Sequence, residues 1–169
     1  MPVTRLNHAV LYVRDVERSV RFYQDVLGFR TVMGMPGAAF LQAEASTNDH
    51  DLGLVQIGSA ATDSPAGRTS VGLYHLAWEV DTLDELDRVF QRLVEAGALV
   101  GSSDHGTTKA LYGHDPDGIE FEVSWLVPAD RITPEVLAAR TSIGPLDIAR
   151  ERQRYGGDTR GGVGVSVPV

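Results

Sequence analysis

The sequence contains no cysteine among its 169 residues. This absence excludes disulfide bonds, zinc–thiolate sites, iron–sulfur clusters and a cysteine nucleophile. Any bound metal would have to be held by histidine, aspartate, glutamate or other oxygen donors. Also absent are an apolar run approaching the roughly 18 residues of a membrane span and a signal-peptide pattern in the opening MPVTRLNHAV. We therefore expect a cytoplasmic protein with no membrane partner.

Basic residues are fewer than acidic residues. Lysine and arginine number 15 against 23 aspartates and glutamates, which gives a formal net charge of -8 and a pI near 5.0. Nucleic acids and anionic membranes are recognised by basic surfaces, so the composition argues against both as partners. The hydrophobic share of 43% is ordinary for a globular protein, and the length predicts one domain or two half-units that share a core.

One hydrophobic pattern occurs twice along the chain. Residues 6–13 read as a buried strand, and the following helix is expected to begin at the N-cap Asp15 and to stop at Gly28. A second strand over 73–80 is followed by a second amphipathic helix within 81–98. Three more strands are expected after each helix, at roughly 29–34, 38–44 and 50–57 and then at 98–102, 107–113 and 119–126. Each half therefore reads β-α-β-β-β.

We predict a single domain over 1–126, with module one at 4–57, a linker at 58–72 and module two at 73–126. The linker is small and polar, as loops are. A C-terminal extension over 127–169 contains one or two short helices and then the glycine-rich GGDTRGGVGVSVPV. Its composition is typical of a flexible tail, which either wraps a neighbouring subunit or extends into solvent.

Two histidines hold equivalent places in the two halves. His8 and His75 lie on the first strand of each half, and Glu122 lies on the last strand of the second. Taken singly, each histidine is more simply explained as an ordinary polar residue in a sheet. Two imidazoles and one carboxylate together form a facial triad, which leaves coordination positions open and suits non-haem Fe(II). We therefore predict a metal site from this trio.

The choice of carboxylate rests on depth in the strand. Glu120 and Glu122 point to the same face because they are two residues apart. Glu122 stands within the apolar run FEVSWLV, where a carboxylate is costly unless it is paired or bound to metal. Glu120 is closer to the turn and is the weaker candidate. In that turn, Asp115 and Asp117 are expected to cap the backbone rather than to bind a ligand.

The second half also carries a longer motif. It runs His105, GTTKA, Leu111, Tyr112, GH, Asp115, Pro116, Asp117, Gly118, IEF, Glu122. This series resembles the signature of the type I extradiol ring-cleaving dioxygenases (catechol 2,3-dioxygenase-like), within the vicinal oxygen chelate superfamily of glyoxalases, bleomycin-resistance proteins and dioxygenases. One position departs from the signature: two residues before His105 it prefers Gly, Asn, Thr, Ile or Val, and this chain has Ser103.

The resemblance implies an α+β fold in which two tandem βαβββ modules form curled mixed sheets around one metal site. It implies His8, His75 and Glu122 as the ligands of Fe(II), with Mn(II) also accepted by such a set. The substrates would be a small aromatic diol and O2, and the product a ring-opened semialdehyde. A homo-oligomer is expected, because an isolated module of this kind exposes sheet edges.

The resemblance also implies roles for further residues. His105 and Tyr112 would hydrogen-bond the substrate oxygens and assist proton transfer. His50, in the segment NDHDLGLV, would lie near bound dioxygen as an acid–base group. Trp78 and His114 are weaker candidates for substrate contact, and Trp78 is also compatible with a place in the core.

Two other functions compete with ring cleavage. Gln56 follows His8 at almost the spacing at which Glu122 follows His75, so Gln56 is a candidate fourth ligand. A His, Gln, His, Glu set resembles that of the methylmalonyl-coenzyme A epimerases, and glyoxalase I also uses four ligands; such enzymes enolise a substrate without dioxygen. From a different class, the chain resembles the metal-free drug-binding proteins of the superfamily, which need no ligand triad.

Overall fold

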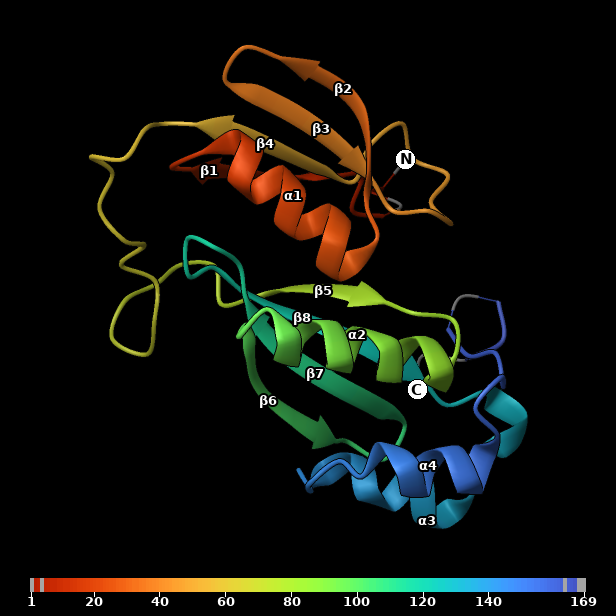
Figure 1. The fold of residues 1–169 in the computed structure, drawn as a ribbon. Helices are drawn as coiled ribbons and strands as arrows, with labels where there is room; N and C mark the ends of the chain where they lie inside the picture. The colour runs from red at the N-terminus through yellow and green to blue at the C-terminus, as the bar shows by residue number, and fades with distance from the viewer. Residues whose placement is uncertain (1, 4, 163, 167–169) are drawn as a thin grey trace. The chain divides into compact units, whose positions relative to one another are not determined.

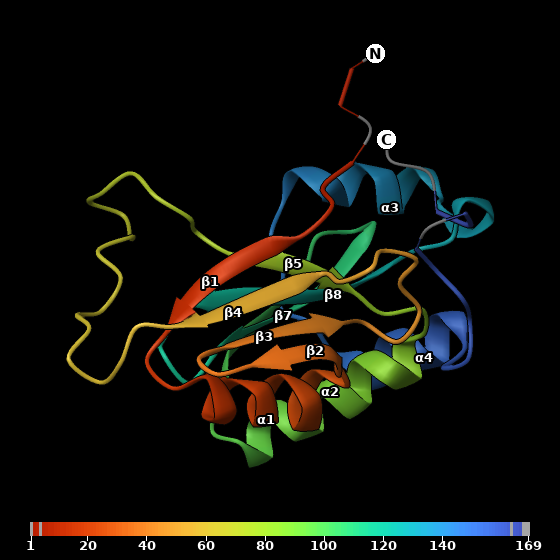
Figure 2. The same cartoon turned by 90° about the horizontal axis from the view of Figure 1, so that it is seen from above.

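The computed structural model describes residues 2–3, 5–162 and 164–166, and it divides into two compact units. The first unit comprises the chain up to Pro65 together with Asp115–Ile119. The second comprises Ala66–His114 and the chain from Glu120 onward. Each unit contains one four-stranded sheet with a long helix on one face, as Figure 1 and Figure 2 show.

The first unit has the predicted order of elements. They are β1 (Ala9–Val13), α1 (Val16–Leu27), β2 (Arg30–Met35), β3 (Ala38–Gln42) and β4 (Leu52–Gln56). The sheet order is β1-β4-β3-β2, with β1 parallel to β4 and the other pairs antiparallel. A parallel pair needs a long connection, and α1 with the β2–β3 hairpin provides it.

Helix α1 begins and ends where its sequence predicts. The Asp15 carboxylate accepts a hydrogen bond from the Arg18 amide at 2.9 Å, which satisfies one of the amides that a helix start leaves unpaired. Gly28 adopts φ 74°, a left-handed conformation that glycine tolerates best. The helix buries Tyr23 and Val26 against the sheet.

The core of the first unit follows the alternation of its strands. Leu11 and Val13 on β1 are buried, as are Leu52 and Leu54 on β4. Because neighbours along a strand point to opposite faces, Tyr12 is left on the other side, where it is 69% exposed. The first unit therefore has one face packed against α1 and one open face.

The second unit repeats this topology and adds a helical extension. Its elements are β5 (Leu76–Glu79), α2 (Leu83–Glu95), β6 (Leu99–Asp104), β7 (Thr108–His114) and β8 (Glu120–Leu126), followed by η1 (Ala129–Arg131), α3 (Pro134–Ala138), η2 (Ala139–Thr141) and α4 (Ile148–Tyr155). The sheet order is β5-β8-β7-β6, with β5 parallel to β8. The duplicated βαβββ pattern and the α+β class are confirmed.

The packed face of the second sheet lies under α2 and α4 (Figure 1) and contains an ion cluster. Lys109 on β7 is only 1% exposed, and its Nζ lies 2.6 Å from Asp104 Oδ1 and 3.1 Å from Glu151 Oε2 on α4. Glu151 is fully buried. Charges at this depth require partners, so the cluster fixes α4 against the sheet.

The glycine-rich end of the chain corrects one expectation. Within the described residues it packs on its own unit through hydrogen bonds and does not extend freely into solvent. The Gly161 amide donates to Asp81 O at 2.8 Å, Trp125 Nε1 donates to Thr159 O at 3.2 Å, and Ser166 Oγ donates to Leu126 O at 3.1 Å. Backbone pairing and the Trp125 indole, which composition does not reveal, decide this placement. Residues 163 and 167–169 of the predicted tail lie outside the described residues.

A search of the described part of the chain found no helix that is long and apolar enough to cross a membrane.

Candidate functional site

The second unit brings His75 and Glu122 together on the open face of its sheet. In the β5–β8 register Ala77 is opposite Glu122, and His75 lies two residues before Ala77, so all three share a face. His75 Nε2 is 3.4 Å from Glu122 Oε2. Two donors on one metal at about 2.1 Å and at a right angle lie about 3 Å apart, so this pair fits one ion.

The other nitrogen of His75 points to the second glutamate. Nδ1 of His75 is 3.9 Å from Glu120 Oε1, and Glu120 Oε2 is 3.6 Å from His114 Nε2. Metal-bound histidines commonly direct the ring nitrogen that is not bound to metal toward a carboxylate, which fixes the ring and its tautomer. At 3.9 Å the contact between His75 and Glu120 is not a hydrogen bond, so the arrangement suits Glu122 as a ligand and makes Glu120 a charged neighbour of His75.

The first unit places His8 beside His50. Their ring centroids are 4.4 Å apart, and the edge of the Phe40 ring packs near His50 at 5.1 Å. His8 Nδ1 is 2.7 Å from the Asn7 side-chain oxygen, so in the neutral ring Nδ1 donates this hydrogen bond and Nε2 keeps a lone pair for a metal. A candidate ligand and the candidate acid–base histidine are thus neighbours.

His50 has its own carboxylate partner. Its Nδ1 lies 2.9 Å from Asp49 Oδ2, and this hydrogen bond lowers the pKa of the Asp49 carboxyl. The imidazole is largely covered, with 16% of its side chain exposed, whereas Asp49 is open to water. Because Asp49 fixes Nδ1, it is Nε2 of His50 that is available for proton transfer.

The predicted metal ligands are divided between the two units. Within neither unit do three His, Asp or Glu side chains of the described residues gather into a complete metal site. One candidate ligand, His8, belongs to the first unit, and two, His75 and Glu122, belong to the second. The local geometry around each of them fits a role as a ligand.

His105 and Tyr112 meet on the same sheet face as Glu122. Tyr112 is opposite Glu122 in the β7–β8 register. His105 Nε2 is 3.1 Å from the Tyr112 hydroxyl. Both side chains also contact Ser103, whose Oγ is 2.8 Å from His105 Nε2 and donates to the Tyr112 hydroxyl at 3.2 Å.

The Tyr112 phenol is held in its protonated form. Burial raises its pKa, the hydrogen bond from Ser103 opposes that rise, and the negative charge of Glu122 adds to it, so the net pKa lies above the ordinary value near 10. At neutral pH the hydroxyl therefore keeps a proton. Such a group can donate a hydrogen bond to an anionic oxygen.

The two weaker candidates for substrate contact, Trp78 and His114, lie in different surroundings. Trp78 is opposite Val123, a buried residue, so it points to the packed face of the sheet and not to the face of Glu122. This placement favours a structural role for Trp78. His114 lies opposite Glu120 at the end of β7, and 48% of its side chain is exposed.

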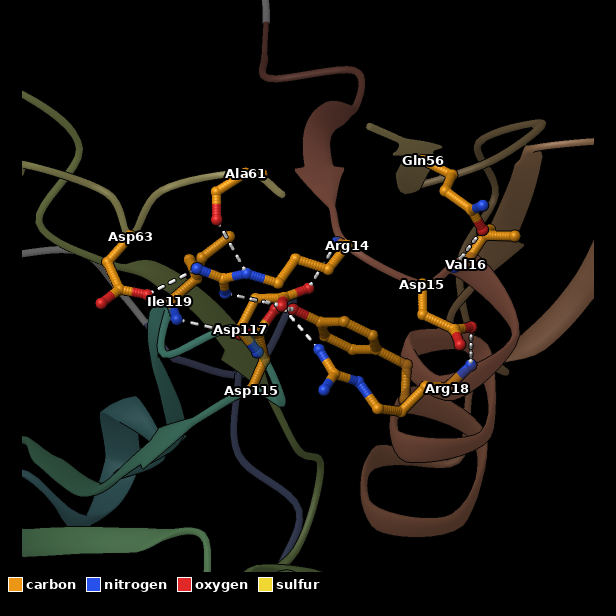
Figure 3. Close-up of polar contacts among 11 residues, drawn as sticks. Arg14, Asp15, Val16, Arg18, Gln56, Ala61, Asp63, Asp115, Asp117 and Ile119 are labelled. Atoms are coloured by element: carbon orange, nitrogen blue, oxygen red, sulfur yellow. Dashed lines mark hydrogen bonds and ion pairs between the residues drawn. The ribbon is translucent and has the colours of Figure 1, made fainter. Parts of the chain in front are cut away.

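The proposed symmetry between Gln56 and Glu122 is not found. In the first unit Val10, which corresponds to Ala77, is opposite Gly53, so Gly53 stands where the second unit has Glu122. Gln56 is opposite the buried Val13 and shares the helix-covered face. Its side-chain oxygen accepts from the Val16 amide at 3.1 Å at the start of α1 (Figure 3). The spacing between residues in the sequence does not reveal this difference, because the two modules have loops of different length.

The Asp-Pro-Asp-Gly turn is built as expected and has an additional partner. Asp115 Oδ1 accepts from the amides of Asp117 and Ile119, both at 2.9 Å, which closes the turn. Asp117 Oδ1 is 3.0 Å from Arg14 Nη1 and 2.6 Å from Arg18 Nη2 (Figure 3). The Asp117 side chain is only 6% exposed, and no pattern in the sequence indicates these ion pairs.

A hollow of about 320 Å³ lies beside this network in the first unit. It is lined by Tyr12, Arg14, Ile57, residues 61–65, Asp117 and Ile119. Within it the Arg14 guanidinium is already engaged by Asp63 at 2.6 Å, by Asp117 and by the Ala61 carbonyl. The hollow therefore contains none of the predicted ligand or acid–base residues and offers a neutralised cation.

The paired βαβββ units, with histidines before the first strands and a carboxylate on the last strand, define the vicinal oxygen chelate class of fold. The family model described as Glyoxalase/Bleomycin resistance protein/Dioxygenase superfamily matches residues 5–123, and the chain belongs to this superfamily. A crystal structure of a glyoxylase/bleomycin resistance protein/dioxygenase domain from Frankia sp. EAN1pec superposes with a TM-score of 0.61 at 24% identity, covering 75% of this chain and 100% of that one.

Two curated relatives differ in function by name. The catechol-2,3-dioxygenase of Bacillus subtilis is 34% identical over 120 residues, which cover 71% of this chain and 41% of the relative. The metallothiol transferase FosB of Lysinibacillus sphaericus is 27% identical over 135 residues, which cover 78% of this chain and 89% of the relative. The chain thus spans about two fifths of the length of the dioxygenase, and similarity alone does not choose between the two activities.

Proposed function

We propose that this chain is a non-haem Fe(II)-dependent extradiol dioxygenase that cleaves the ring of a catechol-type substrate with O2. The observation that carries the proposal is the hydrogen-bonded pair of His105 and Tyr112 on the same sheet face as His75 and Glu122. A resemblance to the epimerases or to glyoxalase I does not explain this pair. The similarity to a catechol-2,3-dioxygenase supports the same reading.

In this proposal His8, His75 and Glu122 hold the metal, which is Fe(II), or Mn(II) on the same ligand chemistry. When bound, the metal supplies adjacent open positions for the two catechol oxygens and for dioxygen. Gly53 adds support, because it leaves the place equivalent to Glu122 without a side-chain donor. A metal with three protein ligands keeps open coordination positions, and dioxygen chemistry needs those positions.

The remaining side chains orient the substrate and move protons. Tyr112, protonated at neutral pH, donates a hydrogen bond to a substrate oxygen. His105, whose Nε2 lies 3.1 Å from the Tyr112 hydroxyl, assists proton transfer at the same oxygen, since histidine is suited to this role near neutrality. His50, fixed at Nδ1 by Asp49, presents Nε2 as the acid–base group beside His8.

A metal-dependent isomerase, lyase or transferase is the second candidate, and the similarity to FosB favours it. For this candidate the expected fourth ligand, Gln56, is engaged at the start of α1, where its oxygen accepts from the Val16 amide. The third possibility, a metal-free binder, would leave the donor geometry of His75 and Glu122 without a purpose.

The test is anaerobic reconstitution with Fe(II), followed by exposure to oxygen and a panel of catechols. We expect one iron per chain, oxygen uptake and a yellow ring-cleavage product. Metal uptake without oxygen consumption for any catechol would support the metal-dependent isomerase, lyase or transferase instead. No metal uptake would support the metal-free binder.

A variant sharpens the assignment of His50. His50→Ala should keep its metal and lose turnover, because His50 is placed as an acid–base group and not as a ligand. Equal loss of metal and turnover would show that His50 is misassigned. Size-exclusion chromatography with light scattering on the same preparations checks the expected homo-oligomer.

A further inference from the structure

We infer that Ser103 is a positioning residue that joins His105 and Tyr112 into one hydrogen-bonded unit and places the His105 proton on Nε2. This inference rests on the proposed function for its catalytic consequence, but its structural part stands on contacts within the second unit. Ser103 is the one position at which the chain departs from the extradiol signature.

The three polar atoms form a closed triangle. Ser103 Oγ is 2.8 Å from His105 Nε2 and 3.2 Å from the Tyr112 hydroxyl, and the last two are 3.1 Å apart. Ser103 is only 6% exposed, so water competes little for its hydroxyl. A buried hydroxyl is normally satisfied by protein partners, and here both partners are the candidate catalytic groups.

The direction of the bond between Ser103 and Tyr112 determines the direction of the bond between Ser103 and His105. A serine hydroxyl has one proton, and Ser103 donates it to the Tyr112 oxygen. The short contact to His105 must then be one in which Ser103 Oγ accepts, so His105 Nε2 carries a proton. Because its oxygen accepts from Ser103, Tyr112 has its own proton available for a substrate oxygen. Ser103 thus sets the tautomer of one group and the orientation of the other.

The backbone around Ser103 and His105 is held firmly enough for this role. Asp104 Oδ1 accepts from the Gly106 amide at 2.8 Å and binds the buried Lys109. Gly106 has φ 73°, and a Cβ there would lie 2.4 Å from the Val136 carbonyl, so the turn is packed directly against the α3 segment. A rigid turn preserves the short distances in the triangle.

A matched pair of substitutions isolates the hydroxyl. Ser103→Thr keeps it, and Ser103→Val has the same shape without it. The extradiol signature accepts both residues at this position, so both are compatible with the strand. Ser103→Ala is the second hydroxyl-free variant and adds no volume in case the extra methyl prevents folding.

The first readout needs neither metal nor substrate. In 15N-labelled protein, with His105 assigned by its loss in His105→Gln, long-range 1H–15N spectra should show a protonated Nε2 in the wild type and in Ser103→Thr. Ser103→Val and Ser103→Ala should lose this tautomer preference. An unchanged His105 pattern in the hydroxyl-free variants would overturn the inference.

The second readout is turnover with the best catechol. We expect kcat of Ser103→Val to be about tenfold below that of Ser103→Thr, the scale of one lost hydrogen bond, with KM changed less than about twofold. Equal kcat in the two variants would overturn the catalytic part. If the wild type cleaves no catechol, the proposed function fails, whereas the tautomer experiment still decides the placement by Ser103.

Discussion

The two units share one topology and differ in what they present on the open face of the sheet. In the first, the last strand places Gly53 opposite the first strand, and the polar residues there are His8 and His50. In the second, the same place holds Glu122, with His105 and Tyr112 beside it. The scaffold was duplicated, and the carboxylate and the hydrogen-bonding pair belong to one copy.

Removing the carboxylate of the second unit should have the largest effect. Glu122→Ala should lower iron affinity by more than about 100-fold, since even changes to residues behind a ligand cost 10- to 100-fold, and ring cleavage should fall below detection. Metal analysis after dialysis and the colour assay measure both. Gln56→Ala is the matched control in the first unit and should keep its iron. Retention of full iron by Glu122→Ala would refute its role as a ligand.

The second largest effect is expected from removing a buried charge of the second unit. Glu151→Ala leaves Lys109, 1% exposed, without one of its two carboxylates, and we expect a loss of about 3–5 kcal/mol in the free energy of unfolding. Glu85 on α2 pairs with Arg88 and Arg92 near the surface, and Glu85→Ala should cost at most about 1 kcal/mol. Urea unfolding measures both. Similar losses would show that burial does not distinguish the two networks.

The ion pairs of the first unit should appear in the pH dependence of stability. Burial alone raises the pKa of Asp117, but hydrogen bonds from the Arg14 amide and from the Arg14 and Arg18 side chains outweigh it, so the pKa lies below its ordinary value. The stabilisation is therefore present above the unfolded pKa of about 3.9 and is lost as the pH falls through the lower, folded value.

Asp117→Asn should accordingly be less stable than the wild type at pH 6 and should approach it as the pH falls below about 4. Urea midpoints between pH 2.5 and 6 test this. Asp115 in the same turn has the opposite sign, because burial raises its pKa above the ordinary value despite hydrogen bonds from the Ile119 and Asp117 amides. A constant gap between wild type and Asp117→Asn across the range would contradict the assignment.

The smallest effect is expected from removing a helix N-cap, a feature that both units have. Asp15 caps α1 by accepting from the Arg18 amide, and Thr82 caps α2 by accepting from the Glu85 amide. Asp15→Ala and Thr82→Ala should each cost about 1 kcal/mol. Thermal or urea unfolding of the two variants should therefore give closely similar losses, and a loss above about 2 kcal/mol in one alone would show that its cap does more than start a helix.

Much of the fold could be predicted because it is local. Apolar residues at helical spacing and the caps Asp15 and Gly28 specify α1, and the alternation of β1 specifies its buried face. The same pattern repeated at 73–126 identified the second module. The packing of the tail on its own unit could not be predicted, because it depends on the Trp125 indole and on backbone groups of Asp81 and Leu126, distant partners that composition does not encode.

The sequence by itself determined the residue types of the candidate site. Lacking cysteine, it restricts a metal to imidazole and oxygen donors, and its repeated strands give His8 and His75 equivalent places. Tertiary structure alone decided the pairing: Gly53 and not Gln56 matches Glu122, Trp78 turns to the core, and Ser103 contacts both His105 and Tyr112. The physical reason is strand register. A shift of one residue along a strand moves a side chain to the other face of the sheet, and the lengths of the loops determine that shift.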